Sequence, residues 1–170
     1  VYDLDLTSLY PSIIMTINIS PETKIGKVND YSAEKHMKKE MESYVITDVN
    51  RETLPPMNID EFNEFINKMN LSVASNGVMY TKNRVGVIPE ILDVWFSKRV
   101  EYKNLMKKYG KAGNDDLYKF YHQRQLVQKI MLNSLYGVLG LPAFRFYDID
   151  NAEGVTLTGQ TVIKTTEMIA

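Results

Sequence analysis

The sequence has 170 residues, of which 44% are hydrophobic and 24% are charged, with a net charge of −1 and no Cys. This composition is ordinary for a globular chain and excludes a disulfide framework and a thiolate metal site. The balanced charge gives no overall signal for nucleic acid. No apolar run approaches the ~20 residues that span a bilayer, so no membrane partner is predicted.

The chain is predicted to begin with a strand and a short helix. Val1–Leu6 alternates apolar and polar residues, which places Asp3 and Asp5 on one face of a strand. Ser8 is expected to cap the helix, and Pro11 is tolerated in its first turns. The predicted elements at both ends lack start or stop signals, so we expect a piece of a longer chain.

The middle of the chain predicts irregular structure with two helices and one hairpin. The helices are expected near Ala33–Tyr44 and Ile59–Met69. Two strand-like runs, 71–75 and 78–81, flank Asn76-Gly77, a pair that supplies the positive φ angles of a tight turn. No motif in this part of the chain indicates a chemistry.

The second half of the chain predicts a helical hairpin. One helix is expected at 89–109 and another at 116–139, separated by turn residues at 110–115. A short strand at 143–147 and a last helix at 151–170 follow. Together these elements predict an α+β fold, in which a short sheet with helices carries a two-helix hairpin.

Asp5 is the first candidate for chemistry, because it ends a predicted strand just before a helix start. A carboxylate there can hold Mg²⁺, which prefers oxygen ligands and bridges to phosphates. The N–H groups of residues 6–10 can bind the same phosphates. An isolated Asp before a helix cap is otherwise a surface residue, and Asp3 is a local rival. The residues alone leave this choice open, within the string Asp5-Leu6-Thr7-Ser8-Leu9-Tyr10-Pro11-Ser12-Ile13.

A second string, Lys129-Ile130-Met131-Leu132-Asn133-Ser134-Leu135-Tyr136-Gly137, lies in the second arm of the hairpin. Lys129, Asn133 and Tyr136 share one helix face. In that order they can hold a phosphate, a phosphate or sugar, and a base. Gly137 has no side chain and allows close approach to a duplex. A polar stripe of this kind is otherwise the water-facing side of an amphipathic helix.

Basic residues gather in the predicted hairpin. Arg99 and Lys103 lie four residues apart on its first arm, a spacing that alone indicates a solvated face. The stretch from Lys98 to Lys129 holds nine Lys or Arg and three acidic residues, a local balance of +6. Arg99 is 14 residues before Gly113 and Lys129 is 16 after it, so both are predicted at the same level at the base of the hairpin. Such a positive surface suits a triphosphate.

The two strings resemble motif A and motif B of family B DNA polymerases. The resemblance covers about residues 1–23 and 86–170. It is strongest to the replicative polymerases of tailed phages, through Asn18-Ile19-Ser20-Pro21-Glu22-Thr23, although the hairpin is shorter here. It implies the amino-terminal part of a palm with an insertion at 1–85, a fingers hairpin at 86–141, and a return into the palm at 142–170.

The resemblance also implies a role for each motif residue. Asp5 is the catalytic, metal-binding carboxylate, and the Leu6 carbonyl faces the metal. The Tyr10 ring lies under the sugar of the incoming nucleotide and blocks a 2′-hydroxyl. The implied nucleotide-binding residues are Leu6, Ser8, Leu9, Tyr10, Arg99, Lys103, Lys129 and Asn133, and the implied DNA-binding residues are Tyr136 and Gly137.

The implied activity is template-directed DNA synthesis from primer-template DNA and deoxynucleoside triphosphates, by a two-metal mechanism with Mg²⁺. The family's second metal-binding Asp lies in a Tyr-Gly-Asp-Thr-Asp-type string, which does not occur in these 170 residues. We therefore expect the chain to be inactive alone and to work with the remainder of the polymerase chain. The expected location is the cytoplasm, or the host cell cytoplasm if a phage encodes the protein.

Two other functions stay open from the sequence. A non-catalytic nucleotide- or DNA-binding half of a split polymerase would share every motif. A helical-hairpin interaction protein with basic arms for an acidic partner would explain the +6 stretch. It gives no reason, however, for the two strings to occur together in this order.

Overall fold

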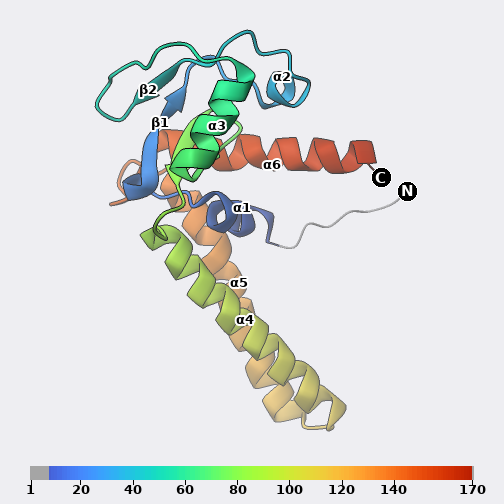
Figure 1. The fold of residues 1–170 in the computed structure, drawn as a ribbon. Coiled ribbons are helices and arrows are strands. Elements are labelled where there is room, and N and C mark those ends of the chain that lie inside the picture. Colours follow the sequence, from blue (N-terminus) through green and yellow to red (C-terminus); the bar gives the residue numbers. More distant parts are fainter. Residues whose placement is uncertain (1–7, 170) are drawn as a thin grey trace.

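The computed structural model describes residues 8–169, and a single antiparallel sheet organises one end of the molecule (Figure 1). β4 (Val78–Thr81) pairs with β3 (Leu71–Val73) on one side and with β1 (Lys24–Val28) on the other. β1 pairs in turn with β2 (Ile46–Asp48). The order across the described sheet is therefore β2-β1-β4-β3.

Strand β4 separates two hydrophobic cores, because successive side chains of a strand point to opposite faces. Val78 and Tyr80 belong to one core, and Met79 belongs to the other. The Met79 side of the sheet packs against α3 (Ile59–Met69). The opposite side packs against α1 (Leu9–Ile17) and the long helices.

The three long helices are α4 (Val87–Lys111), α5 (Asp115–Leu139) and α6 (Ile149–Ile169). α4 and α5 form a hairpin that projects away from the sheet (Figure 1). The rings of Tyr109 and Tyr121 stack between its arms, with centroids 5.6 Å apart. Helix α1 contacts all three long helices, so it lies where the hairpin joins the rest of the molecule. No helix within residues 8–169 is long and apolar enough to cross a membrane.

The predicted α+β class is confirmed, as are the two long hairpin helices, the α3 helix and the β3–β4 hairpin. The predicted helix at 33–44 is wrong beyond Met37, where α2 (Ala33–Met37) ends. Lys39 has a left-handed backbone with φ 59°, which a continuing helix cannot contain. Tyr44 is instead fully buried and bridges to Met57.

The strand predicted at 143–147 is also wrong. The N–H groups of Phe144 and Tyr147 bond to carbonyls three residues earlier, which makes this segment a run of turns. Strands β1 and β2 were not predicted, because neither run alternates clearly between apolar and polar residues. The strand predicted at Val1–Leu6 lies outside the described residues.

The β3–β4 connection has three residues rather than two. Ala74 and Val78 are paired by the Ala74 N–H, which donates to the Val78 carbonyl at 2.8 Å. The Gly77 N–H donates to the Ala74 carbonyl at 2.8 Å, and of the Asn76-Gly77 pair only Gly77 has a positive φ, 84°. This is a tight turn followed by one left-handed residue, a common hairpin connection. A glycine is required at residue 77 for two reasons. Its φ is positive, and a Cβ there would lie 2.6 Å from the Val28 carbonyl oxygen.

We predict that Gly77→Ala destabilises the protein more than Gly113→Ala does. Both glycines have positive φ, so each Ala pays about 1 kcal/mol of left-handed strain. Only Gly77 adds a steric overlap, which costs about 1–3 kcal/mol more, since nothing lies within 4 Å of a Cβ on Gly113. Urea unfolding of both variants measures the difference. Equal losses of stability would contradict the steric overlap of a side chain at Gly77 with Val28 and Tyr31.

Candidate functional site

Ser8 joins the start of α1 to the hairpin. Its backbone is left-handed, with φ 57°, and its side chain makes no capping hydrogen bond to α1. Instead, Nη1 of Arg99 donates to Ser8 Oγ at 2.9 Å. The predicted cap is therefore right in position and wrong in bonding. Because the Ser8 hydroxyl is used by Arg99, it leaves the first N–H groups of α1 available to another acceptor.

Tyr10 and Tyr136, from the two separate strings, pack against each other. Their ring centroids are 4.5 Å apart and the rings are tilted by 33°. Burial, with a smaller contribution from Tyr10, raises the pKa of the Tyr136 phenol above its ordinary value. Tyr10 remains 38% exposed, and that exposed part can meet a ligand.

Arg99 and Lys129 lie at the same level of the hairpin. Gly110 of α4 packs against Tyr118 of α5, since a Cβ on Gly110 would lie 3.0 Å from that ring. Eleven residues back along α4 from Gly110 is Arg99, and eleven residues forward along α5 from Tyr118 is Lys129. Both helices rise by about 1.5 Å per residue, so the two residues return to one height.

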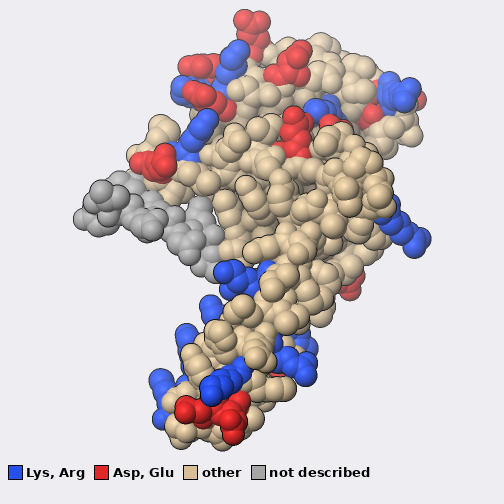
Figure 2. All heavy atoms as spheres, turned by 180° about the vertical axis from the view of Figure 1, so that it is seen from behind, with Lys and Arg blue, Asp and Glu red and all other residues tan. Residues whose placement is uncertain are grey.

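The remaining predicted hairpin residues are open to solvent in different degrees. Lys129 and Asn133 are exposed and Lys103 is half-buried, and none of the three makes a hydrogen bond or ion pair within the described part of the chain. A Cβ on Gly137 would meet nothing within 4 Å, so its backbone faces open space. Figure 2 shows Lys and Arg side chains along the hairpin, with acidic side chains at its tip.

The predicted metal ligands, the Asp5 carboxylate and the Leu6 carbonyl, lie outside the described residues. Among residues 8–169, no three His, Asp or Glu side chains come together as a metal site. A single carboxylate and a carbonyl are oxygen donors of the kind that Mg²⁺ shares with substrate phosphates. Nε of Arg99 is buried and has no hydrogen-bond partner among residues 8–169. This spare cationic donor beside Ser8 suits an anionic group such as a phosphate.

Asn18 fixes the base of the hairpin, a role that sequence reasoning missed. Asn18 is buried at the end of α1, and its Nδ2 donates to the carbonyls of Thr81 at 2.6 Å and Arg84 at 2.8 Å. Its Oδ1 accepts from the Gly86 N–H at 2.8 Å, directly before α4. A carboxylate oxygen of Glu22 accepts from the Val87 N–H at 2.6 Å and so caps α4.

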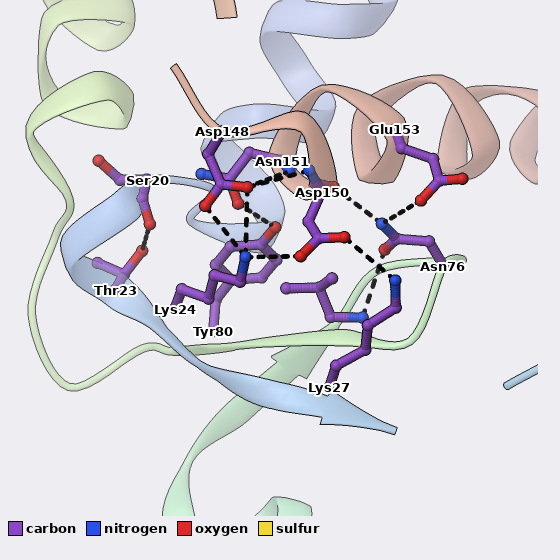
Figure 3. A network of polar contacts seen from close by, with 11 residues as sticks. Ser20, Thr23, Lys24, Lys27, Asn76, Tyr80, Asp148, Asp150, Asn151 and Glu153 are labelled. Atoms are coloured by element: carbon purple, nitrogen blue, oxygen red, sulfur yellow. Dashed lines mark hydrogen bonds and ion pairs between the residues drawn. The ribbon is translucent and has the colours of Figure 1, made fainter. Parts of the chain in front are cut away.

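An ion-pair network fixes the start of α6 to strand β1, and sequence reasoning missed it too (Figure 3). Nζ of Lys24 lies 3.0 Å from Asp148 and 2.8 Å from Asp150, and Lys27 pairs with Asp150 at 3.1 Å. Oδ1 of Asp148 also accepts from the N–H groups of Asp150 and Asn151, which caps α6. The two ends of this network are more than 120 residues apart, so no local pattern could reveal it.

Amide side chains extend the network into the core. Nδ2 of Asn76, in the β3–β4 turn, donates to the Asp150 carbonyl at 2.8 Å. The buried Tyr80 hydroxyl donates to Oδ1 of Asn151 at 2.7 Å. These bonds hold the β3–β4 hairpin against α6, and α6 in turn packs against α1.

The contacts within this network shift the pKa values of Lys24 and Asp150. The hydrogen bond from Lys24 holds the pKa of Asp150 below its usual value despite partial burial. Burial alone would lower the pKa of Lys24, but its bonds to Asp150 and Asp148 outweigh burial and raise it. The pair is therefore charged at neutral pH and stabilises the folded state.

We predict that Lys24→Met lowers the free energy of unfolding by about 1–2 kcal/mol at neutral pH. This is less than for a fully buried pair, because the Asp150 side chain is 34% exposed. A carboxyl with a lowered pKa contributes stability that is lost as the pH falls through that pKa. The difference between Lys24→Met and the unsubstituted protein should therefore shrink at acid pH.

Lys38→Met is the matched control for that measurement, because Lys38 pairs with Glu34 on the surface of the molecule. We expect no measurable change in its stability. Denaturant unfolding at several pH values would check both variants. A loss for Lys24→Met that does not depend on pH would contradict the ion-pair account.

The sequence and the fold of this chain resemble those of known proteins. Residues 1–170 match the family described as DNA polymerase family B. The DNA-directed DNA polymerases of Escherichia phage RB69 and Enterobacteria phage T4 are 27% and 29% identical, over 96% of this chain and 21% of each relative. The solved family B DNA polymerase of the hyperthermophilic archaeon Pyrobaculum calidifontis superimposes with a TM-score of 0.64 at 25% identity, over 97% of this chain and 17% of that chain.

These similarities confirm the resemblance inferred from the two strings, including its phage component. The chain spans about a fifth of the length of the phage relatives. The phage alignments run over 217 positions, more than the 170 residues of this chain. Those relatives therefore carry additional residues within the matched region.

Proposed function

The chain belongs to DNA polymerase family B, and we propose that it supplies the nucleotide-gripping part of an active site for template-directed DNA synthesis. One observation carries the proposal. Residues of the two strings and of the basic hairpin, distant in sequence, meet at the start of α1, where Arg99 bonds to Ser8 and Tyr10 packs on Tyr136. The complete reaction, deoxynucleotidyl transfer to a primer 3′ end, is proposed for the polymerase that includes the remainder of the chain.

In this proposal the hairpin at 86–141 is the fingers, 1–85 is the amino-terminal part of the palm with an insertion, and 142–170 returns into the palm. The insertion has its own hydrophobic core under α3, which supports a structural role for it. Primer-template DNA would lie against Tyr136 and Gly137, and the open space at Gly137 supports this placement. The proposed compartment is the cytoplasm, where the template and the nucleotides are available.

The triphosphate of the incoming nucleotide would bind between the start of α1 and the hairpin. The N–H groups of Leu9 and Tyr10, in the first turn of α1, have no partner within the helix and can donate to phosphate oxygens. Arg99, Lys103, Lys129 and Asn133 would neutralise and orient the same phosphates. Electrostatic positioning of this kind dominates catalysis of phosphoryl transfer.

Tyr10 would lie under the sugar and exclude a 2′-hydroxyl by its ring. Two Mg²⁺ ions, held by the Asp5 carboxylate, the Leu6 carbonyl and ligands from the remainder of the polymerase, would supply charge neutralisation and a more nucleophilic primer oxygen. The residues of this chain then have three tasks, which are to hold the phosphates, to select the sugar and to align the α-phosphate with the primer end.

We predict that Asp5→Ala in the complete polymerase abolishes primer extension. A metal-binding carboxylate cannot be replaced by a methyl group, and loss of one such ligand costs orders of magnitude in rate. Asp3→Ala is the matched control, because Asp3 is the neighbouring acid on the same predicted strand face. Its extension rate should stay near that of the unsubstituted enzyme. Normal extension by Asp5→Ala, or equal loss in both variants, would refute the assignment of Asp5.

We further predict that Lys129→Ala raises the Kd of the polymerase–DNA complex for deoxynucleoside triphosphate by roughly 10- to 100-fold, the value of one charge-assisted hydrogen bond. The loss should be smaller at high salt, because screening already weakens the contact. Lys119→Ala, an exposed lysine of the same helix near the hairpin tip, is the control and should leave the Kd unchanged. Nucleotide titration by fluorescence or calorimetry measures both. Equal effects would indicate a diffuse charge effect and not a phosphate site.

A further inference from the structure

We propose that Gly159 of α6 positions the Tyr10 ring and thereby sets how strongly the polymerase rejects ribonucleotides. The inference rests on the proposed function, since it takes Tyr10 as the residue under the sugar. Gly159 belongs to neither of the two motif strings and was assigned no chemistry from the sequence. It is a positioning residue, because it acts on the nucleotide only through Tyr10.

The Tyr10 ring lies directly against the backbone of α6. A Cβ on Gly159 would stand 3.1 Å from Tyr10 Cε1 and 3.6 Å from Cδ1, and 3.5 Å from Ile13 Cδ1. Carbon atoms in good contact are about 3.5–4.0 Å apart, so the first of these distances is too short for a side chain unless the ring moves. The edge of the Tyr10 ring therefore occupies the space that a side chain at residue 159 would fill.

The control position Gly140 does not have such a neighbour. Gly140, at the end of α5, would place a Cβ no closer than 3.7 Å to any atom, an ordinary contact. A glycine inside a helix is also less favourable than an alanine, so helix stability does not explain Gly159. Close packing against Tyr10 explains it.

The helix that carries Gly159 is held in place, so the ring and not the helix must respond to added volume. The Ser75 N–H donates to Thr158 Oγ1 at 3.0 Å, one residue before Gly159. The ion pairs of Lys24 with Asp148 and Asp150 fix the start of the same helix to strand β1 (Figure 3). Close-packed interiors transmit such displacements to the neighbour that can move.

The exposed side of Tyr10 gives its ring room to move. Its ring is bounded by α6 behind it and by the Tyr136 ring, whose centroid is 4.5 Å away. Tyr10 is 38% exposed, and the proposed function puts the sugar on this exposed side. A methyl group on Gly159 would push the ring by a few tenths of an ångström toward the sugar. Because a ribose needs the most room there, its rejection should become stronger.

The test measures kcat/KM for matched deoxyribo- and ribonucleoside triphosphates with the complete polymerase and a primer-template. Five proteins are compared, which are the unsubstituted enzyme, Gly159→Ala, Tyr10→Ala, the double variant and, as control, Gly140→Ala. A single methyl group changes discrimination by roughly 10-fold or more when it fully blocks a pocket, so for this partial shift we expect Gly159→Ala to raise the deoxy-to-ribo ratio about fivefold. Tyr10→Ala should collapse the ratio, the double variant should match Tyr10→Ala, and Gly140→Ala should match the unsubstituted enzyme.

The outcomes separate this inference from the proposed function. A Gly159→Ala ratio that is unchanged or lower, while Tyr10→Ala collapses the ratio, overturns the inference and leaves the function standing. A Tyr10→Ala ratio equal to that of the unsubstituted enzyme removes the sugar-selecting role of Tyr10 itself, and the inference with it. If Gly159→Ala does not fold, folding of the double variant supports the ring contact, and failure of both variants overturns it.

Discussion

Helix α1 packs against α4, α5 and α6 at the same time, and this packing determines where the rest of the site lies. Ile13 and Ile14 bury the helix in the main core, so its amino-terminal end is held beside the base of the hairpin. Asn18, at its other end, binds the loop that enters α4. One nine-residue helix thus sets the position of the Ser8–Arg99 contact and of the Tyr10 ring.

Charge is distributed unevenly over this framework. The stretch from Lys98 to Lys129 carries a balance of +6 within a chain of net charge −1, so the remaining residues carry −7. Lys and Arg side chains line the hairpin (Figure 2), whereas at the start of α6 the ion pairs balance Lys24 and Lys27 with Asp148 and Asp150 (Figure 3). In the proposed function, this uneven charge would direct an anionic substrate to the hairpin.

Local signals in the sequence predicted much of the fold and the identity of the motif residues. The hairpin at Asn76-Gly77 and the helices at 59–69, 89–109 and 116–139 follow from signals that act over a few residues. The structure contains all of them, with a three-residue connection in place of the expected tight turn. Long-range contacts could not be predicted in this way. The Ser8 hydroxyl accepts a hydrogen bond from Arg99 and does not cap its own helix. Tyr44 is buried in a hydrophobic core and is not helical as predicted. The ion-pair partners of Lys24 lie beyond residue 147. Gly159 carried no signal, because what matters there is a neighbour 149 residues earlier in the chain.

The central claim is that the start of α1 and the base of the hairpin grip one nucleotide from two sides. A structure of the complete polymerase with primer-template, Mg²⁺ and a non-hydrolysable deoxynucleoside triphosphate tests it most directly. The account predicts phosphate oxygens in contact with both Arg99 and Lys129 and with the first N–H groups of α1, with the sugar over the Tyr10 ring. A triphosphate bound away from α1, with Arg99 still bonded to Ser8 and Lys129 in solvent, would contradict it.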